Sequence, residues 1–481
     1  MQTDSLAKLV TIVDQILRRR EISPGRRHVS AFLRALFFTS LKTEEGRPLR
    51  LRITLVNPKG ADLRDRRNAA PDRWNIVRLG KRVLLTPSTL AKIASAADPW
   101  SSTIAVYFGK DGGTFIWGLV DQGLGFSKML VREAEGASPP PGVVQIQING
   151  TGDLSIYRGS RFVARLRLDT LIRTEPDVFL SGPVRDGLWL GFEKHLGSVG
   201  GAFGLRGLSA EPGSSFDLTE RVYDTECYIT GLVNSSAFWW FGALCRLLIN
   251  ITRYRHGGAI LITPSSDDLN ITYPIRYSRL RTSLANSTVW AIKEDNLFFE
   301  FWPSRRRKEI KTEVYKKWHK AGRNLEHYES ELTGCIRFIA SLSCVDGLIL
   351  ANPDLTIRGF GVEILSKAEV DEVYVSSSAD LDQNTLRKVS SKNFGTRHRS
   401  MFRYCYAHDT SVGFVISQDG DLRAIRRVGN QLIVWENPKI MALSQRRSRV
   451  VGAPDQSVPG SAPASAPDYA DQGITDDDIP F

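Results

Sequence analysis

One segment, residues 236–249, limits most strictly what this chain can fold into. It is apolar nearly all the way round a helix, so that helix must be buried against a sheet or a partner. The apolar stretch 237–251 is about fifteen residues long and contains Arg246, which makes it too short and too charged to span a bilayer. A glycine turn and a buried strand follow over residues 256–264. We therefore expect a helix packed on a sheet.

The region before this segment has a different pattern. Apolar residues recur at helical spacing over residues 6–17 and 29–41. Five short β-rich runs then follow between residues 103 and 166, separated by Gly, Asp or Pro. A Gly- and Ser-rich passage, residues 197–215, marks a boundary. The predicted fold class is α/β (α+β), with an N-terminal α+β domain (1–200), a Gly/Ser-rich connection (201–234), a second domain (235–440) and a tail (441–481).

Charge and cysteine usage restrict the partners and the compartment. The net charge of +12 and the pI of about 9.5 point to a polyanionic partner. The five cysteines are scattered and never spaced as C-x-x-C, so neither a disulfide framework nor a zinc site is indicated. Residues 1–20 carry Asp4 and Asp14 and do not read as a signal peptide. We expect a cytoplasmic protein with no membrane partner.

The C-terminal tail has the opposite charge to the rest of the chain. Residues 451–481 contain six aspartates, five prolines and no Lys or Arg, so they cannot build a core and are predicted to be disordered. The remaining 450 residues therefore carry a net charge of +18. That body is basic enough to bind DNA through phosphate contacts.

Gly395-Thr396-Arg397-His398-Arg399 is the strongest candidate for chemistry. The two arginines offer guanidinium forks to phosphate oxygens, and Gly395 permits close approach of a ligand. A helix beginning at the arginines would place its positive end near a bound phosphate. A basic surface turn with solvated arginines is the alternative for these five residues taken alone.

The motif and its surroundings resemble the diadenylate cyclase (DAC) domain, as in the DNA-integrity scanning protein. The likeness covers residues 235–436: Asp346-Gly347, a hairpin through Gly359-Phe360-Gly361, the G-T-R-H-R string, and a strand that ends in Ser417. It implies a DAC-like domain with a central mixed sheet flanked by helices. Residues before 235 are similar in broad plan to the sensor domains found ahead of some predicted DAC domains.

In that family two facing domains each hold ATP, and the 3′-hydroxyl of one ATP attacks the α-phosphate of the other, releasing pyrophosphate. The resemblance implies ATP as substrate, Mg²⁺ or Mn²⁺ as cofactor and a homo-oligomer. The implied catalytic residues are Asp346, Arg397, His398 and Arg399; the implied nucleotide-binding residues are Gly347, Leu348, Gly395, Thr396 and Ser417; the implied metal ligands are Asp346 and Asp419.

Three departures from the family pattern bear on activity. Leu348 stands where the family has alanine, and the spacer before Gly395 is longer than usual. The customary Ser-Glu-Glu is Ser417-Gln418-Asp419, so the first glutamate is absent. Asp419 is the candidate replacement for that carboxylate.

The final six residues resemble the tip of bacterial single-stranded DNA-binding protein. Asp476, Asp477, Asp478, Ile479, Pro480 and Phe481 end the chain after a Pro/Ala/Ser-rich linker. In such tips acidic residues meet a basic rim and the last Phe fills a hydrophobic pocket on repair and replication enzymes, so proteins that bind these tips are the implied partners. Two alternatives are a solubilising acidic tail and a tail that folds back on the basic body.

Three functions remain open from the sequence. The first is a nucleotidyltransferase that makes cyclic di-AMP or a related dinucleotide, gated by the N-terminal domain and recruited to DNA repair or replication by its tail. The second is a DAC-like fold without catalysis that senses a nucleotide or DNA, which Gln418 and Leu348 favour. The third is a single-stranded DNA-binding protein, although five evenly spaced strands of an oligonucleotide-binding barrel are not apparent.

Overall fold

A computed structural model describes residues 4–19, 23–58, 74–98, 100–110, 112–123, 126, 143–159, 161–210, 228–254, 256–306, 312–381, 386–418 and 420–440. Met1–Gln445 form one compact unit that contains two large sheets. The predicted mixed α+β class is confirmed. The predicted disordered tail and its tip, residues 441–481, lie outside the described residues, as do Asp419 and residues 211–227 of the predicted connection.

The first sheet has the strand order β10-β9-β8-β7-β3-β5-β6-β4. Only β3 and β5 run parallel, and the other neighbours are antiparallel. The five β-rich runs predicted between residues 103 and 166 correspond to β5 through β9. The strands are β3 Leu51–Leu55, β4 Asn75–Leu84, β5 Ser102–Phe108, β6 Thr114–Asp121, β7 Val144–Gly150, β8 Asp153–Arg158, β9 Arg161–Arg167 and β10 Thr170–Ile172.

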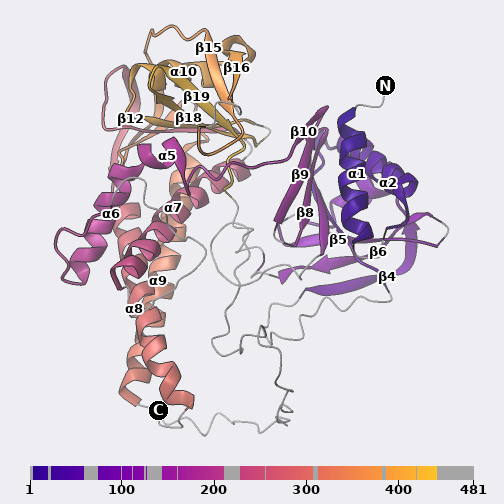
Figure 1. Cartoon of the computed structure of the whole chain (residues 1–481), viewed down its shortest axis with the longest axis horizontal. Helices are drawn as coiled ribbons and strands as arrows, with labels where there is room; N and C mark the ends of the chain where they lie inside the picture. Colours follow the sequence, from indigo (N-terminus) through magenta and orange to yellow (C-terminus); the bar gives the residue numbers. More distant parts are fainter. Residues whose placement is uncertain are drawn as a thin grey trace, which may run out of the picture. The chain divides into compact units, whose positions relative to one another are not determined.

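Helices α1 (Asp4–Arg18) and α2 (Arg26–Ser40) pack on this sheet, as Figure 1 shows in indigo. Their apolar stripes share one core with alternate residues of the strands, including Leu51, Ile53 and Leu55 of β3. Helix α3 (Pro87–Ala94) belongs to the same core and begins with a capping box at Thr86. A small two-stranded sheet of β1 (Thr43–Glu44) and β2 (Arg47–Pro48) follows α2.

The second sheet has the order β12-β14-β13-β11-β17-β18-β19-β15-β16 and is mixed. Near its centre lies β11 (Gly258–Ile262), which runs parallel to β13 and antiparallel to β17. The predicted central mixed sheet is therefore present. The other strands are β12 Leu269–Tyr277, β13 Leu348–Ala351, β14 Ile357–Ile364, β15 Glu372–Ser376, β16 Leu386–Ser390, β17 Val412–Ile416, β18 Leu422–Val428 and β19 Gln431–Glu436.

Helices cover both faces of the second sheet because the strands are apolar on both sides. One face packs on α5, α6, α7, α8 and α9, and the other packs on α10. Helices α8 and α9 lie along each other as a long hairpin (Figure 1). The bounds are α5 Gly182–Gly187, α6 Trp189–Ala202, α7 Tyr228–Tyr254, α8 Arg279–Arg306, α9 Thr312–Leu342 and α10 Thr396–Ala407, with a 3₁₀ turn at Ser391–Asn393.

Helix α7 contains the apolar segment 236–249 and extends beyond it at both ends. Over Ile229–Tyr254 it has the length and composition of a helix that could cross a membrane, yet 78% of its most apolar window is buried inside the protein. Trp240, Phe241 and Leu244 lie in the core of the second sheet. The prediction of a helix buried against a sheet is confirmed.

The core of the second sheet also recruits residues from before the predicted boundary at residue 200. Val178, Phe192 and Val199 pack in one cluster with residues of α7 and β17. The four predicted segments remain a prediction. The contacts show that α5 and α6 belong with the second sheet.

Candidate functional site

The candidate site lies at one end of the central strands of the second sheet. Because β11 and β13 run parallel and β17 runs antiparallel to them, the starts of β11 and β13 meet the end of β17. Gly257 precedes β11, Asp346-Gly347 precedes β13, and Ser417-Gln418 follows β17. The topology thus gathers three segments that are far apart in the sequence.

Arg397 reaches this same end of the sheet. A methyl group added at Gly257 would lie 2.8 Å from Nη1 of Arg397 and 3.1 Å from the backbone nitrogen of Gln418. Gly257 also has a φ of +64°, which favours glycine. The structure therefore brings Arg397 of the G-T-R-H-R string close to the residues that follow β17.

Helix α10 begins inside the string, with Gly395 as its N-cap. Glycine has no side chain to cap the helix, so the first-turn amides and the positive helix end face outward. Gly395, Thr396 and Arg397 are exposed, and Arg399 is half-buried. An exposed helix N-terminus flanked by an arginine is suited to an anion such as phosphate.

Asp346 is exposed. Position 347 requires glycine because of its backbone conformation and its contacts inside the protein. Gly347 has a φ of +111°, and a methyl group added there would lie 2.6 Å from the carbonyl carbon of Gly361. Gly361 itself has a φ of +62° and packs beneath the ring of Tyr273. These contacts fix the start of β13, and with it the backbone that carries Asp346. Leu348, the first residue of β13, is buried in the core on the α10 face.

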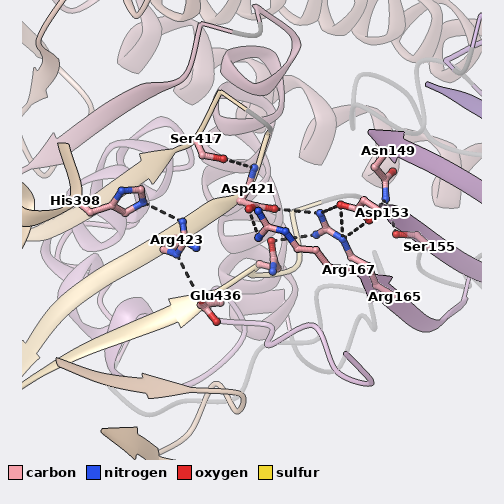
Figure 2. A network of polar contacts seen from close by, with 11 residues as sticks. Asn149, Asp153, Ser155, Arg165, Arg167, His398, Ser417, Asp421, Arg423 and Glu436 are labelled. Carbon is pink, nitrogen blue, oxygen red and sulfur yellow. Dashed lines mark hydrogen bonds and ion pairs between the residues drawn. The ribbon is translucent and has the colours of Figure 1, made fainter. Parts of the chain in front are cut away.

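His398 is turned into the protein, unlike its neighbours. It is 9% exposed, and its Nε2 accepts a hydrogen bond from Nη1 of Arg423 at 3.0 Å (Figure 2). Burial, together with the charges of Arg423 and Arg397, lowers the pKa of His398 to about 4. His398 is therefore neutral at pH 7. In this structure it fastens α10 to β18.

Arg423 is held from a second side by Glu436 of β19. Its Nε donates to Oε1 of Glu436 at 3.2 Å, and its guanidinium lies over the ring of Phe394, 5.4 Å from the ring centroid. One arginine thus joins the centre of the sheet to the segment just before the helix and to the helix itself.

Ser417 organises the turn between β17 and β18. Its backbone nitrogen donates to the carbonyl oxygen of Asp421 at 2.8 Å, and its Oγ accepts from the backbone nitrogen of Asp421 at 3.1 Å (Figure 2). The nitrogen of Gly420 donates to the carbonyl oxygen of Ser417 at 2.9 Å. Ser417 was predicted to bind nucleotide; here it fixes the turn that carries exposed Gln418.

The carboxylate of Asp421 joins this turn to the first sheet. It is 2% exposed and forms ion pairs with Arg165, at 3.1 Å, and with Arg167, both on β9 (Figure 2). Nε of Arg165 donates to Asp153 of β8 at 2.9 Å. We call Asp153, Arg165, Arg167 and Asp421 the Asp421 cluster.

The electrostatics of the Asp421 cluster are balanced. Burial alone would lower the pKa of Arg165, but the hydrogen bond and charge of Asp153 and the charge of Asp421 outweigh it and raise the pKa. Nη1 of Arg165 also donates to Oδ1 of Asn437, just beyond β19, at 3.1 Å. Because Asp421 is buried and its arginine partners are partly buried, the cluster is a specific contact of two arginines with the turn after Ser417.

Sequence reasoning missed Asp421, Arg423 and the two arginines of β9. A signal was present, because Arg165-Leu166-Arg167 places two charges on one face of a strand whose other face is buried. Their partner Asp421 lies 256 residues from Arg165, so no local pattern could have identified it.

The predicted metal ligands are only partly described. Asp346 is present and exposed, and Asp419 lies outside the described residues. In the part of the chain that the structure describes, no group of three or more His, Cys, Asp or Glu side chains could hold a metal ion. A single carboxylate fits Mg²⁺ carried in with nucleotide phosphates, which commonly needs one or two protein carboxylates.

Comparison with protein families identifies the N-terminal part. Residues 18–121 match the family described as "Probable sensor domain DACNV", the N-terminal sensor of DAC-containing proteins. The match covers α2 through β6 and supports the predicted sensor-like character of this part of the chain. Searches of curated proteins and of solved structures returned no match.

Proposed function

We propose that this chain is a nucleotidyltransferase of the diadenylate cyclase type, gated by its DACNV sensor domain. The observation that carries the proposal is the gathering of Arg397, Gly257 and Gln418 at the strand end that also bears Asp346. The sensor domain adds support, because such sensors precede DAC domains.

Each residue at this end of the sheet has its own role in the proposed reaction. The 3′-oxygen of one ATP forms a bond to the α-phosphorus of an ATP held by a second copy of the chain, and the bond to the β-phosphate breaks with pyrophosphate as the leaving group. The reciprocal attack by the 3′-oxygen of the second nucleotide closes the ring and releases a second pyrophosphate. Asp346 takes the hydroxyl proton and would hold Mg²⁺ or Mn²⁺, which neutralises phosphate charge when bound. Arg397, Arg399 and the N-terminus of α10 bind phosphate oxygens.

Gating follows from the contacts of the turn after β17. The backbone that carries Gln418 is held by Ser417 and Asp421, and Asp421 is held by two arginines of the first sheet. A change in the first sheet that moves Arg165 or Arg167 would shift the turn that carries Gln418, and would thereby alter the surroundings of Arg397. This contact supports control of the nucleotide end by the sensor.

Incubation of the purified chain with ATP and Mn²⁺ or Mg²⁺ tests the proposal. We expect a cyclic dinucleotide and pyrophosphate, with product falling at least about 100-fold in Asp346→Asn because the proton acceptor and metal ligand are lost. Asp409→Asn, an exposed carboxylate just beyond α10, is the matched control and keeps activity. Equal product from Asp346→Asn and wild type would refute the role of Asp346.

A catalytically inactive nucleotide sensor is the second candidate, favoured by Gln418 in place of the family's glutamate. The same experiment separates the two, because an inactive sensor binds ATP and yields no dinucleotide with either metal. Restoring the carboxylate with Gln418→Glu then tests whether that single position accounts for the loss.

The tail is proposed to recruit proteins that bind the tip of single-stranded DNA-binding protein. The support is in the sequence, where three aspartates precede Ile479, Pro480 and a terminal Phe481. Deleting Phe481 is expected to abolish capture of such a protein, because the ring is lost from its pocket and the terminal carboxylate moves to Pro480. Tyr469→Ala is the control within the tail, and undiminished capture after the deletion would contradict the proposal.

A further inference from the structure

The two faces of the first sheet differ in chemistry. Leu51, Ile53 and Leu55 of β3 point toward α1 and α2, so Arg52 and Thr54 point to the opposite face. We call this the polar face; the strands beside β3 contribute Thr103, Gln145 and Gln147 to it. Despite their polarity, four of these side chains are at most 3% exposed: Arg52, Thr54, Thr103 and Gln145.

Most polar groups on this face have partners. Nε2 of Gln145 donates to Oγ1 of Thr54 at 2.9 Å, and Oγ1 of Thr54 donates to Oγ1 of Thr103 at 3.0 Å. Nη2 of Arg52 donates to Oε1 of Gln147 at 3.1 Å. The face is thus an ordered hydrogen-bond network, and the buried polar atoms that lack a partner are the ones that require an explanation.

Arg52 is a buried cation for which the described residues supply no contacting anion. Its Nε and Nη1 have no hydrogen-bond partner among the residues described. Burial lowers the pKa of its guanidinium to about 10. The nearby carboxylate of Asp98 is exposed and accepts from the backbone nitrogen of Trp100 and from Oγ of Ser101. An uncompensated buried charge is costly, and water could satisfy its hydrogen bonds but not its charge.

Gln122 presents a second unpaired group on the same face. It follows β6, is fully buried, and both its amide oxygen and its amide nitrogen lack a partner in the described part of the chain. Thr103 pairs with Val120, so Gln122 shares the polar face by alternation and lies two strands from Arg52. Two strand spacings and an offset of two residues along β6 separate their backbones by about 12 Å.

An aromatic group lies beside these residues. The ring of Phe126 lies 5.3 Å from the guanidinium carbon of Arg52, and Trp74 packs edge-on against Phe126 at 5.2 Å. Both rings belong to a small apolar cluster with Trp117 and Val120. Apolar walls around a few unpaired polar groups are typical of small-molecule sites.

We propose that Arg52 and Gln122 bind a small organic anion, with a carboxylate or phosphate on Arg52 and a hydrogen-bonding group on Gln122. The binding site rests on contacts within the first sheet; the identification of this anion as the signal for the sensor rests on the proposed function. β3 through β6 lie within the residues that match the sensor family.

The polar face continues toward the Asp421 cluster. Asn149 lies two residues beyond Gln147 on β7, and its Nδ2 donates to Oδ1 of Asp153 at 2.9 Å. Asp153 is the partner of Arg165, which contacts Asp421 (Figure 2). An anion at Arg52 therefore lies on the strand face that leads to the nucleotide end.

Thermal unfolding of the full chain with Arg52→Met tests the site. Without added anion, we expect the midpoint of Arg52→Met to lie about 2 °C or more above wild type, because an unpaired buried charge is removed. Phosphate and succinate are the two probes, compared with NaCl at equal ionic strength. We expect at least one to raise the midpoint of the intact site and neither to raise that of Arg52→Met. Gln122→Leu should reduce the shift.

All anion measurements use an Arg397→Ala/Arg399→Ala background, so that phosphate binding at the nucleotide end contributes as little as possible. Arg161→Met, an exposed arginine of β9, is the matched control and keeps the shift. A lower ligand-free midpoint for Arg52→Met, a shift retained by that variant, or no shift from either probe with Arg52 intact would overturn the proposal. Because unfolding requires no nucleotide, the outcome is independent of whether the chain makes a dinucleotide.

Discussion

Replacing Arg397 with alanine is expected to weaken binding of a non-hydrolysable ATP analogue by about 10- to 100-fold. Its guanidinium lies at the end of the central strands, close to Gly257 and the backbone of Gln418. Hydrogen bonds to charged groups contribute about 1.5–3 kcal/mol each, which corresponds to this range. Dinucleotide formation should fall further than binding, since phosphate charge grows at the leaving group.

Arg403 provides the matched control for Arg397. It is also exposed and lies on the same helix, but more than one turn farther from the N-terminus. Arg403→Ala should retain ATP-analogue affinity within about twofold, since it lies outside the helix end that binds the phosphates. Calorimetric titration of both variants decides the matter. Equal losses of affinity would show that general positive charge, and not the G-T-R-H-R geometry, attracts the nucleotide.

Breaking the Asp421 cluster should lower both stability and nucleotide affinity. Asp421→Asn leaves Arg165 and Arg167 facing an uncharged amide in a buried position, at a cost of about 3 kcal/mol in the free energy of unfolding. Arg167→Gln should weaken ATP-analogue binding several-fold although Arg167 is on the first sheet, because the turn after Ser417 loses one of its anchors.

A double-mutant cycle gives this prediction its sharpest form. If Arg167 acts through Asp421, the losses of affinity in Arg167→Gln and Asp421→Asn should be strongly non-additive when combined. Arg161→Gln, exposed on the same strand, should leave affinity unchanged. The titrations are made well below the unfolding temperature of every variant, so that a loss of stability does not change the measured affinity. Additive losses, or an effect from Arg161→Gln, would contradict the coupling.

Much of the fold follows from periodicity in the sequence. The strands β5 through β9 alternate or run apolar between turn residues, and α1 and α2 carry clear apolar stripes. Predictions for β17, β18 and β19 rest on the same rule. Strands β15 and β16 were missed, and β16 is largely polar with no apolar run.

Only those parts of the candidate site whose residues are adjacent in the sequence were predictable. Gly395 to Arg399 mark the start of a helix, and the structure places that start where Arg397 meets the end of β17. The environment of His398 was not predictable, because its partner Arg423 is brought by sheet pairing. The same holds for Arg52, whose unpaired state depends on every strand around it.

Strand β18 has hydrogen-bonded neighbours on both sides, β17 and β19, in an unbroken register. Sliding it by one residue would break both ladders and turn Asp421 and Arg423 to the opposite face. A change in the first sheet that alters the contacts of Asp421 therefore changes the conformations of side chains and of the turn, and not the strand register. Such conformations interconvert quickly and over short distances. A sensor coupled in this way alters the fraction of time for which the turn is correctly set, and it requires no large domain movement.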